Sequence, residues 1–395
     1  MDISHIVRYS ERENIMSSKV KKIIFGKKFC FLFQKCKYAS VINEELSIYP
    51  NASFDENETD YFVTVDDKYS ENDDSHYGRN PKEMYVSDQN LCINYSWGIV
   101  SWSDGRIHLS YNPRMYGKFA SFVRHMLDIQ FYTQPQWAGQ RLYEDILINV
   151  AFWDPNYFVL HGSGISDTNG NVIIIGGTGG TGKTSTVLSM RGRMDRIFVC
   201  DDLCPITKEG RVFVNYDMPK IYAYNVINNK EMEDMILEDE GFVSRLQWKI
   251  LKKGNPARVR RRVKPSKLYI LANSELSSML HLKAYLILNR TCDVSDIKVD
   301  EVDPQSAAEM TIEIMRTEFS KFATFLNYYK LNGLYKGNRS FPDAEECFAK
   351  WKNNMIAAFE QSSIRMISIP YDYNNEKLKE RMNSIIDQIY SNKEK

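Results

Sequence analysis

The stretch that most constrains this chain spans residues 172–186 and reads VIIIGGTGGTGKTST. It opens with four β-branched residues and no polar alternation, as expected of a strand buried on both faces of a parallel sheet. Gly177, Gly182, Lys183 and Thr184 then fit the pattern GxxxxGK[ST], whose backbone amides surround phosphate groups. The order of strand, glycine-rich loop and helix predicts a Walker A loop in an α/β fold.

The residue types of this loop predict how it binds a nucleotide. Glycines keep side-chain bulk away from the phosphates, and the free N–H groups of the following helix favour an anion. Lys183 supplies a mobile cation, and the Thr184 hydroxyl can ligate Mg²⁺. A glycine-rich turn before an ordinary helix is the less favoured alternative, because every motif position is filled. We therefore expect ATP and Mg²⁺ as cofactors, bound by Gly177, Thr178, Gly179, Gly180, Thr181, Gly182, Lys183, Thr184 and Ser185.

The length and composition of the chain limit its class. A chain of 395 residues exceeds what one core usually holds, and 43% hydrophobic with 26% charged residues is typical of a soluble globular protein. Basic and acidic residues both number 51, so the charge gives no reason to expect nucleic acid or a membrane as a partner. No stretch approaches the roughly 18 apolar residues of a spanning helix. Seven scattered cysteines without CxxC spacing suit a reducing compartment, and we expect a cytoplasmic protein.

The pattern of apolar residues predicts three parts. Residues 1–115 are β-rich and include a hairpin turn at Asp104-Gly105; they carry no chemical motif, so substrate recognition, assembly and a scaffold role all stay open. In residues 116–155 the apolar residues have helical spacing over 116–131 and 139–152, and these helices are expected to link the N-terminal part to the nucleotide-binding domain. Residues 156–395 form the nucleotide-binding domain. Its later elements are predicted as a strand over 285–288, a helix capped by Asp303, a helix over 342–359, a strand over 364–369 and a helix over 374–390.

Two further motifs flank the loop. An apolar strand over residues 157–160 is expected to end at the sequence HGSG, beginning with His161, and a turn at 167–170 leads back to the loop strand. After the loop only a short helix fits before Gly192, and a strand over 197–200 then runs into Asp201-Asp202. This compact order of HGSG, GGTGGTGKT and DD resembles the HPr kinase/phosphorylase and PEP carboxykinase superfamily. The resemblance covers residues 158–219.

The resemblance implies a P-loop kinase core and a role for each matched residue. Lys183 and Thr184 would hold the phosphates and the metal, Asp201 would be the metal-side carboxylate, and Asp202 would be the base that faces the acceptor hydroxyl. His161 matches a histidine close to the metal and phosphate, although a structural hydrogen bond that closes the hairpin explains it equally well. Neighbouring side chains at a strand end point to opposite sides, which allows the two aspartates to differ in role.

The chain departs from the HPr kinases after this region. Their glycine- and arginine-rich signature is replaced by an acidic stretch over 231–240 and by a basic run, which leads into a predicted strand over 267–271. Arginine can hold a phosphate or carboxylate through two parallel hydrogen bonds, so Arg260 and Arg261 are candidates for an acceptor clamp. A solvated loop that neutralises the acidic stretch is the alternative. The basic run comprises Arg258, Arg260, Arg261, Arg262, Lys264 and Lys267.

These features predict an ATP-dependent kinase that phosphorylates a hydroxyl group of a peptide, a protein or a small hydroxy metabolite. Two alternatives stay open, a nucleotide-binding regulatory or assembly module with weak or no transfer, and a PEP carboxykinase-like lyase. The expected partners are a nucleotide and the hydroxyl acceptor, without nucleic acid or a membrane. A homo-oligomer is left open.

Overall fold

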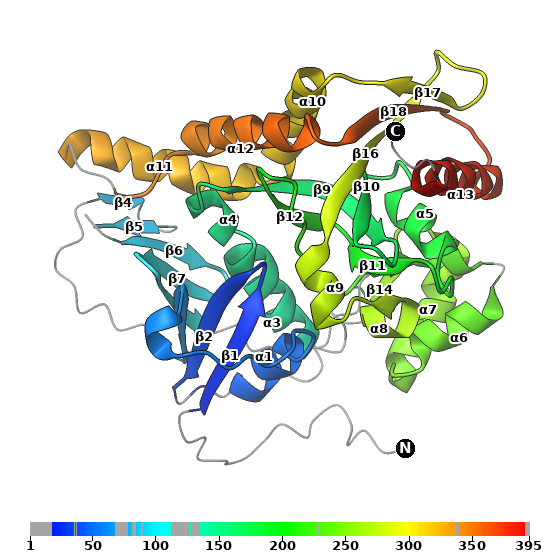
Figure 1. The fold of residues 1–395 in the computed structure, drawn as a ribbon. Coiled ribbons are helices and arrows are strands. Elements are labelled where there is room, and N and C mark those ends of the chain that lie inside the picture. Colours follow the sequence, from blue (N-terminus) through cyan, green and yellow to red (C-terminus); the bar gives the residue numbers. More distant parts are fainter. Residues whose placement is uncertain are drawn as a thin grey trace. The chain divides into compact units, whose positions relative to one another are not determined.

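The computed structural model divides the chain into two compact units, Met1–Met115 and Tyr116–Lys395. It describes residues 18–34, 36, 38–67, 78–80, 84–87, 90–111, 123, 127, 134–227, 229–336 and 340–391. Both units combine helices with β-sheets, so the fold is mixed α/β (Figure 1). In the described part of the chain, no helix combines the length and the apolar character needed to cross a bilayer.

The first unit is built on an eight-stranded sheet with the order β1-β2-β3-β8-β7-β6-β5-β4. β2 and β3 run parallel, as do β3 and β8, and all other neighbours are antiparallel. The predicted hairpin at Asp104-Gly105 is confirmed, because Ser103 pairs with Arg106 across it. The strands are β1 Ser18–Ile24, β2 Lys27–Phe33, β3 Tyr61–Asp66, β4 Gly78–Asn80, β5 Met84–Val86, β6 Leu91–Tyr95, β7 Gly98–Ser103 and β8 Arg106–Tyr111, with helices α1 Ala39–Leu46 and η2 Glu56–Glu58.

The second unit is built on an eight-stranded sheet with the order β15-β11-β9-β10-β16-β18-β17, and β12 adds to it by pairing with β9. β10, the predicted loop strand, lies near its centre, antiparallel to β9 and parallel to β16. Its four β-branched residues are fully buried, as the apolar run predicts. The strands are β9 Tyr157–Ser166, β10 Asn171–Gly177, β11 Ile197–Cys200, β12 Leu203–Thr207, β15 Ile270–Leu271, β16 His281–Thr291, β17 Lys298–Glu301 and β18 Ser363–Pro370.

β9 is longer than the sequence indicates. The predicted strand ends at His161, but β9 continues through the HGSG sequence to Ser166. Its first half pairs with β12 and its second half with β10 and β11. A Cβ at Gly162 would lie 2.8 Å from the Ile174 side chain, and one at Gly164 would lie 2.8 Å from the Cys200 sulfur. These glycines therefore allow close packing within a strand and do not end it.

Helices surround this sheet. α10 and α12 pack against β9, and α13 packs against α5 (Figure 1). The Asp303 cap is confirmed, since its carboxylate accepts from the Ser306 amide at 2.9 Å. The predicted strands over 285–288 and 364–369 lie within β16 and β18. The helices are α5 Lys183–Ser189, α9 Ser274–Met279, α10 Pro304–Glu318, α11 Ser320–Lys336, α12 Ala344–Phe359 and α13 Asn375–Ser391.

The acidic stretch and the basic run form a small subassembly next to α5. The strands β13 Lys220–Tyr222 and β14 Arg260–Arg262 pair with each other. In the sequence between them lie η4 Ala223–Val226, α6 Lys230–Leu237 and α7 Phe242–Gly254. The predicted strand over 267–271 is largely wrong. Pro265 instead begins the short helix α8 Pro265–Leu268, and only Ile270–Leu271 forms the edge strand β15.

The connecting segment is partly described. The predicted helix over 116–131 lies almost wholly outside the described residues. The predicted helix over 139–152 is confirmed as three consecutive pieces, α3 Gln134–Leu142, η3 Tyr143–Leu147 and α4 Val150–Trp153. The middle piece, η3, is a π-helical turn.

Candidate functional site

The loop between β10 and α5 places glycine where other residues do not fit. Gly177 has a φ of 128°, and a Cβ there would lie 2.5 Å from the carbonyl oxygen of Leu288. A Cβ at Gly179, in contrast, would meet no atom within 4 Å. Neither packing nor backbone conformation explains glycine at position 179. The open space beside Gly179 would admit a group from outside the chain.

Lys183 begins α5, and its side chain folds back over the loop. Its ammonium group donates to the carbonyl oxygens of Gly177 at 2.8 Å and Thr178 at 2.9 Å. Burial lowers the pKa of Lys183, and Asp202 and Asp201 act in the opposite direction. α5 has only seven residues. We therefore attribute the positive potential of the loop to this ammonium group and to the loop amides.

Asp201 follows β11 directly and faces the loop. The Thr184 hydroxyl donates to its Oδ1 at 2.9 Å, and the Ser163 hydroxyl of β9 donates to the same oxygen. Burial raises the pKa of Asp201 to about 6, in spite of these two hydrogen bonds. A carboxylate held at this pKa has too little compensation from its present partners. A cation bound beside it would supply the missing charge.

Thr184 and Asp201 together fit a Mg²⁺ ion. Mg²⁺ prefers a few protein oxygens, and phosphates and water complete its coordination. Within the described residues no group of three or more His, Cys, Asp or Glu side chains could hold a metal. Asp201 and the Thr184 hydroxyl are therefore suited to a metal that arrives with phosphates, and unsuited to an ion held by protein ligands alone.

Asp202 points to a different set of partners. Its backbone has a φ of 76°, which is unusual for a residue other than glycine, and its carbonyl accepts from the Gly162 amide at 3.0 Å. Its carboxylate oxygens lie 3.3 Å from His161 Nε2 and 3.2 Å from Lys220 Nζ. Burial opposes ionisation, but Lys220 and His161 outweigh it and hold the pKa well below its usual range. The side chain is 39% exposed, so the ionised carboxylate can meet a solute.

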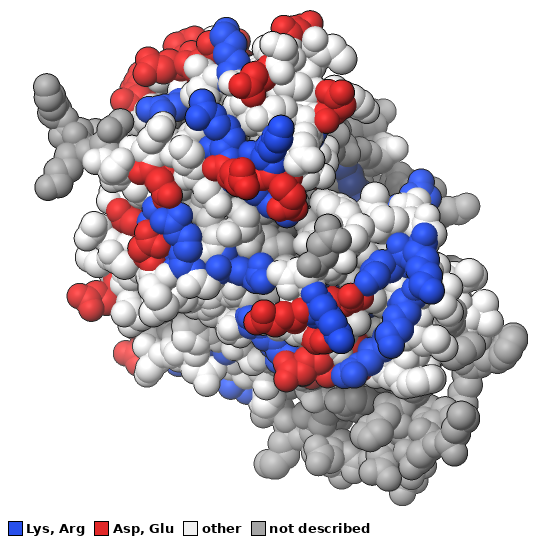
Figure 2. Space-filling view, turned by 90° about the vertical axis from the view of Figure 1, so that its right-hand side faces the viewer, with Lys and Arg blue, Asp and Glu red and all other residues white. Residues whose placement is uncertain are grey.

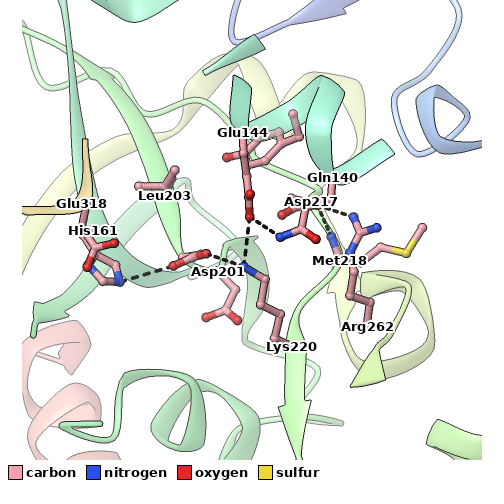
Figure 3. A network of polar contacts seen from close by, with 12 residues as sticks. Gln140, Glu144, His161, Asp201, Leu203, Asp217, Met218, Lys220, Arg262 and Glu318 are labelled. Atoms are coloured by element: carbon pink, nitrogen blue, oxygen red, sulfur yellow. Dashed lines mark hydrogen bonds and ion pairs between the residues drawn. The ribbon is translucent and has the colours of Figure 1, made fainter. Parts of the chain in front are cut away.

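His161 connects Asp202 to α10. Its Nδ1 lies 2.8 Å from Oε1 of Glu318, the last residue of that helix. Burial lowers the pKa of His161, but the contacts with Asp202 and Glu318 outweigh it, and the net shift is upward. The imidazole therefore lies between two carboxylates, and in its protonated form it compensates the charge of both; His161 and Glu318 are labelled in Figure 3.

The network extends past Lys220. Lys220 Nζ lies 3.3 Å from Oε1 of Glu144, a residue of η3 (Figure 3). On the strand opposite Lys220, Arg262 donates to Asp217 at 2.7 Å in a fully buried ion pair. This pair fixes the chain just before Lys220.

The predicted acceptor clamp is not formed in this structure. Arg261 is fully buried, and its guanidinium donates to the Ser244 carbonyl at 3.0 Å and to Gln247 Oε1 at 2.6 Å, both on α7. It also lies over the ring of Trp248. Arg260 donates to the Tyr222 hydroxyl at 2.5 Å. Arg261 therefore lies inside the subassembly, where its hydrogen bonds hold α7 against β14.

The loop helix also contacts this subassembly. Ser185, which we predicted to bind nucleotide, accepts from the Asn225 side chain of η4 at 2.7 Å. Asn225 Oδ1 in turn accepts from the Tyr222 amide at 3.2 Å. The first turn of α5 is therefore tied to the strand that carries Lys220.

The structure thus brings together Lys183, Thr184, Asp201, Asp202 and His161. Four side chains of this network were missed: Ser163, Lys220 and Glu318, which contact these residues, and Glu144, which contacts Lys220. Ser163 could have been found, because it lies two residues from His161 on the same face of a strand. The other three come from distant elements, and no local pattern marks them.

The face in Figure 2 carries mixed charge. On the face in Figure 2, Lys and Arg side chains lie among Asp and Glu side chains, so this face offers no uniformly basic surface for nucleic acid. Comparison of the chain with protein-family models and with curated proteins finds no match.

Proposed function

We propose that this chain is a Mg²⁺-requiring, ATP-dependent kinase with an HPr kinase-like P-loop core, and that it phosphorylates a hydroxyl group. One observation carries the proposal. The Thr184 hydroxyl, at the end of the GxxxxGKT sequence, donates to Asp201 at 2.9 Å, while the adjacent Asp202 faces away toward His161 and Lys220. One carboxylate can serve a metal while its neighbour serves the acceptor.

The chain's own residues divide the work. The loop amides and Lys183 would bind the β- and γ-phosphates, with Lys183 exchanging its two loop carbonyls for phosphate oxygens. Thr184 and Asp201 would hold Mg²⁺, which when bound neutralises phosphate charge. Asp202, ionised and partly exposed, would accept a hydrogen bond from the acceptor hydroxyl and so orient it.

The transfer follows from this arrangement. The acceptor oxygen forms a bond to the γ-phosphorus as the bond from that phosphorus to the β–γ bridging oxygen breaks, and the hydroxyl proton passes to Asp202. Phosphoryl transfer needs mainly positioning and charge neutralisation, so a carboxylate of low pKa is adequate. His161 compensates the charge of Asp202 and Glu318 and keeps the proton acceptor in place.

A second candidate is a nucleotide-binding regulatory module with weak or no transfer. It is favoured by the ion pairs of Asp202, which hold its pKa far below that of an efficient base. In this function Asp202 would orient water for slow hydrolysis, and nucleotide binding would control association with a partner.

We also propose a cytoplasmic location. All seven cysteines are free, six of them buried and only Cys292 exposed. Free thiols of this number suit a reducing compartment.

The direct test is a screen of metabolites and peptides for an ATP-dependent mass gain of one phosphoryl group. The full chain is incubated with ATP and Mg²⁺, and Lys183→Ala serves as the control. Because the Lys183 ammonium group donates to loop carbonyls, the variant is expected to fold but to lose most of its nucleotide affinity or turnover.

The outcomes separate the candidates. A hydroxyl acceptor that gains mass with the wild type and not with Lys183→Ala supports the kinase. ATP binding that changes only partner association supports the regulatory module, and oxaloacetate-dependent turnover indicates a carboxykinase-like lyase. Equal ATP binding by wild type and folded Lys183→Ala refutes the nucleotide site.

A further inference from the structure

The π-helical turn η3 reaches the residues around Asp202 through two consecutive side chains. The Tyr143 hydroxyl accepts from the amide group of Asn215, which also donates to the Leu203 carbonyl at 2.7 Å. Glu144, the next residue of η3, lies 3.3 Å from Lys220. π-Helical turns occur frequently at functional sites. The connecting segment, in which the sequence shows no chemical motif, thus contributes directly to the site.

Lys220 is held between two carboxylates. Its ammonium group lies 3.2 Å from Asp202 Oδ2 and 3.3 Å from Glu144 Oε1. The backbone at Lys220 pairs with Arg262 across β13 and β14, and the buried pair of Arg262 with Asp217 fixes the preceding residues. Both the backbone and the charged end of Lys220 are therefore restrained (Figure 3).

We propose that Lys220 is a positioning residue for the phosphoryl transfer, and that Glu144 of η3 holds its ammonium group where it fixes the orientation of the Asp202 carboxylate. This inference rests on the proposed function. It extends the site to β13 and η3, which lie outside the resemblance motifs.

The geometry gives Lys220 a specific task. Asp202 directs Oδ1 to His161 and Oδ2 to Lys220, so each oxygen has one cationic partner. Without Lys220 the carboxylate keeps a single partner and can rotate about its Cα–Cβ and Cβ–Cγ bonds. Misorientation of a group that must meet a hydroxyl costs rate without weakening nucleotide binding, because the Lys183 loop contacts are separate.

The first experiment compares the kinetics of Lys220→Ala, Lys220→Arg and Glu144→Gln. ADP formation from ATP and Mg²⁺ is measured on the full chain, with water as the acceptor until a better one is found. We expect kcat to fall about 10–100-fold in Lys220→Ala and less in Glu144→Gln, with the KM for ATP within about twofold of wild type. Lys220→Arg keeps the charge and is expected to recover part of the rate.

The matched control is Lys298→Ala. Lys298 also forms an ion pair, with Asp300 at 2.9 Å on the edge strand β17, but its side chain is exposed. Its loss should leave both kcat and KM unchanged. A folded Lys220→Ala variant with the kcat of wild type overturns the proposal.

The second experiment is a double-mutant cycle with Asp202→Asn. If Lys220 acts through Asp202, adding Lys220→Ala to Asp202→Asn should slow turnover no further than Asp202→Asn alone. Rate losses that multiply would assign Lys220 a role independent of Asp202 and would overturn the positioning role.

A third measurement does not depend on turnover. Lys220 and His161 share the Asp202 carboxylate, so removal of the lysine charge in Lys220→Ala should raise the pKa of His161. This pKa is measured from the imidazole NMR signals of His161, which are assigned by their loss in His161→Gln. Lys298→Ala should leave that pKa unchanged. An unchanged pKa in folded Lys220→Ala overturns the arrangement itself. A wild type that transfers phosphate to no acceptor of the screen, water included, instead refutes the proposed function, whatever His161 shows.

Discussion

Replacing Arg261 by alanine separates a structural role of the basic run from an acceptor-binding role. The guanidinium is fully buried against α7 and donates to Ser244 and Gln247. Its removal leaves the Gln247 oxygen buried without this donor and opens a void over Trp248. An unsatisfied buried acceptor costs about 1–3 kcal/mol, and the lost packing adds to this. We expect Arg261→Ala to lower the free energy of unfolding by about 2–4 kcal/mol.

Arg260→Ala is the matched control for this change. Arg260 is only half-buried; it donates to the Tyr222 hydroxyl and lies over the ring of that residue. Its loss should cost about 0.5–1.5 kcal/mol. The two neighbours in the basic run should therefore differ clearly in stability, although an acceptor clamp would make them similar in function.

The assay is urea unfolding followed by tryptophan fluorescence, because Trp248 lies directly under the Arg261 guanidinium. Acceptor kinetics are measured on the folded fraction once an acceptor is known. Arg261→Ala with wild-type stability and a strongly raised acceptor KM would refute the structural role and restore the clamp. Equal destabilisation by Arg260→Ala and Arg261→Ala would refute the argument from burial.

Four further substitutions test the rest of the site. Because burial raises the pKa of Asp201 to about 6, the folded state loses stability as the pH rises from about 4 through 6. In metal-free urea titrations, Asp201→Asn should therefore raise the free energy of unfolding by up to about 3 kcal/mol at pH 8 and little at pH 4. The same substitution should increase the Mg²⁺ concentration needed for turnover. A loss of stability at pH 8 would contradict this. Asp202→Asn should slow transfer roughly 100- to 10,000-fold with ATP affinity unchanged by calorimetry, and a metal defect like that of Asp201→Asn would remove the division of roles. Gly162→Ala places a Cβ 2.8 Å from the Ile175 carbonyl and should cost about 1–3 kcal/mol in thermal or urea unfolding, whereas Gly179→Ala should keep wild-type stability and weaken ATP binding.

The sequence by itself determined the elements whose signals are local. The uninterrupted apolar run predicted β10, the glycines and Lys183 predicted the loop, and Asp303 predicted the start of α10. The position of the two aspartates after β11 was also predicted, because charged residues directly after an apolar run indicate where a strand ends. Each of these features depends on neighbouring residues and on backbone preferences that act over a few positions.

Tertiary structure decided the partners of Asp202. Lys220 reaches it from β13, Glu144 acts on it through Lys220 from η3, and Glu318 acts on it through His161 from the end of α10. Only the packing of these elements sets their distances. The same holds for Arg261. A run of basic residues indicates a solvated surface, yet in β14, which pairs with β13, the consecutive residues Arg261 and Arg262 are both buried. α7 supplies carbonyl and amide oxygens for the Arg261 guanidinium. Composition determines how many charges a segment carries, but burial and pairing, which determine what those charges do, depend on residues far away in the chain.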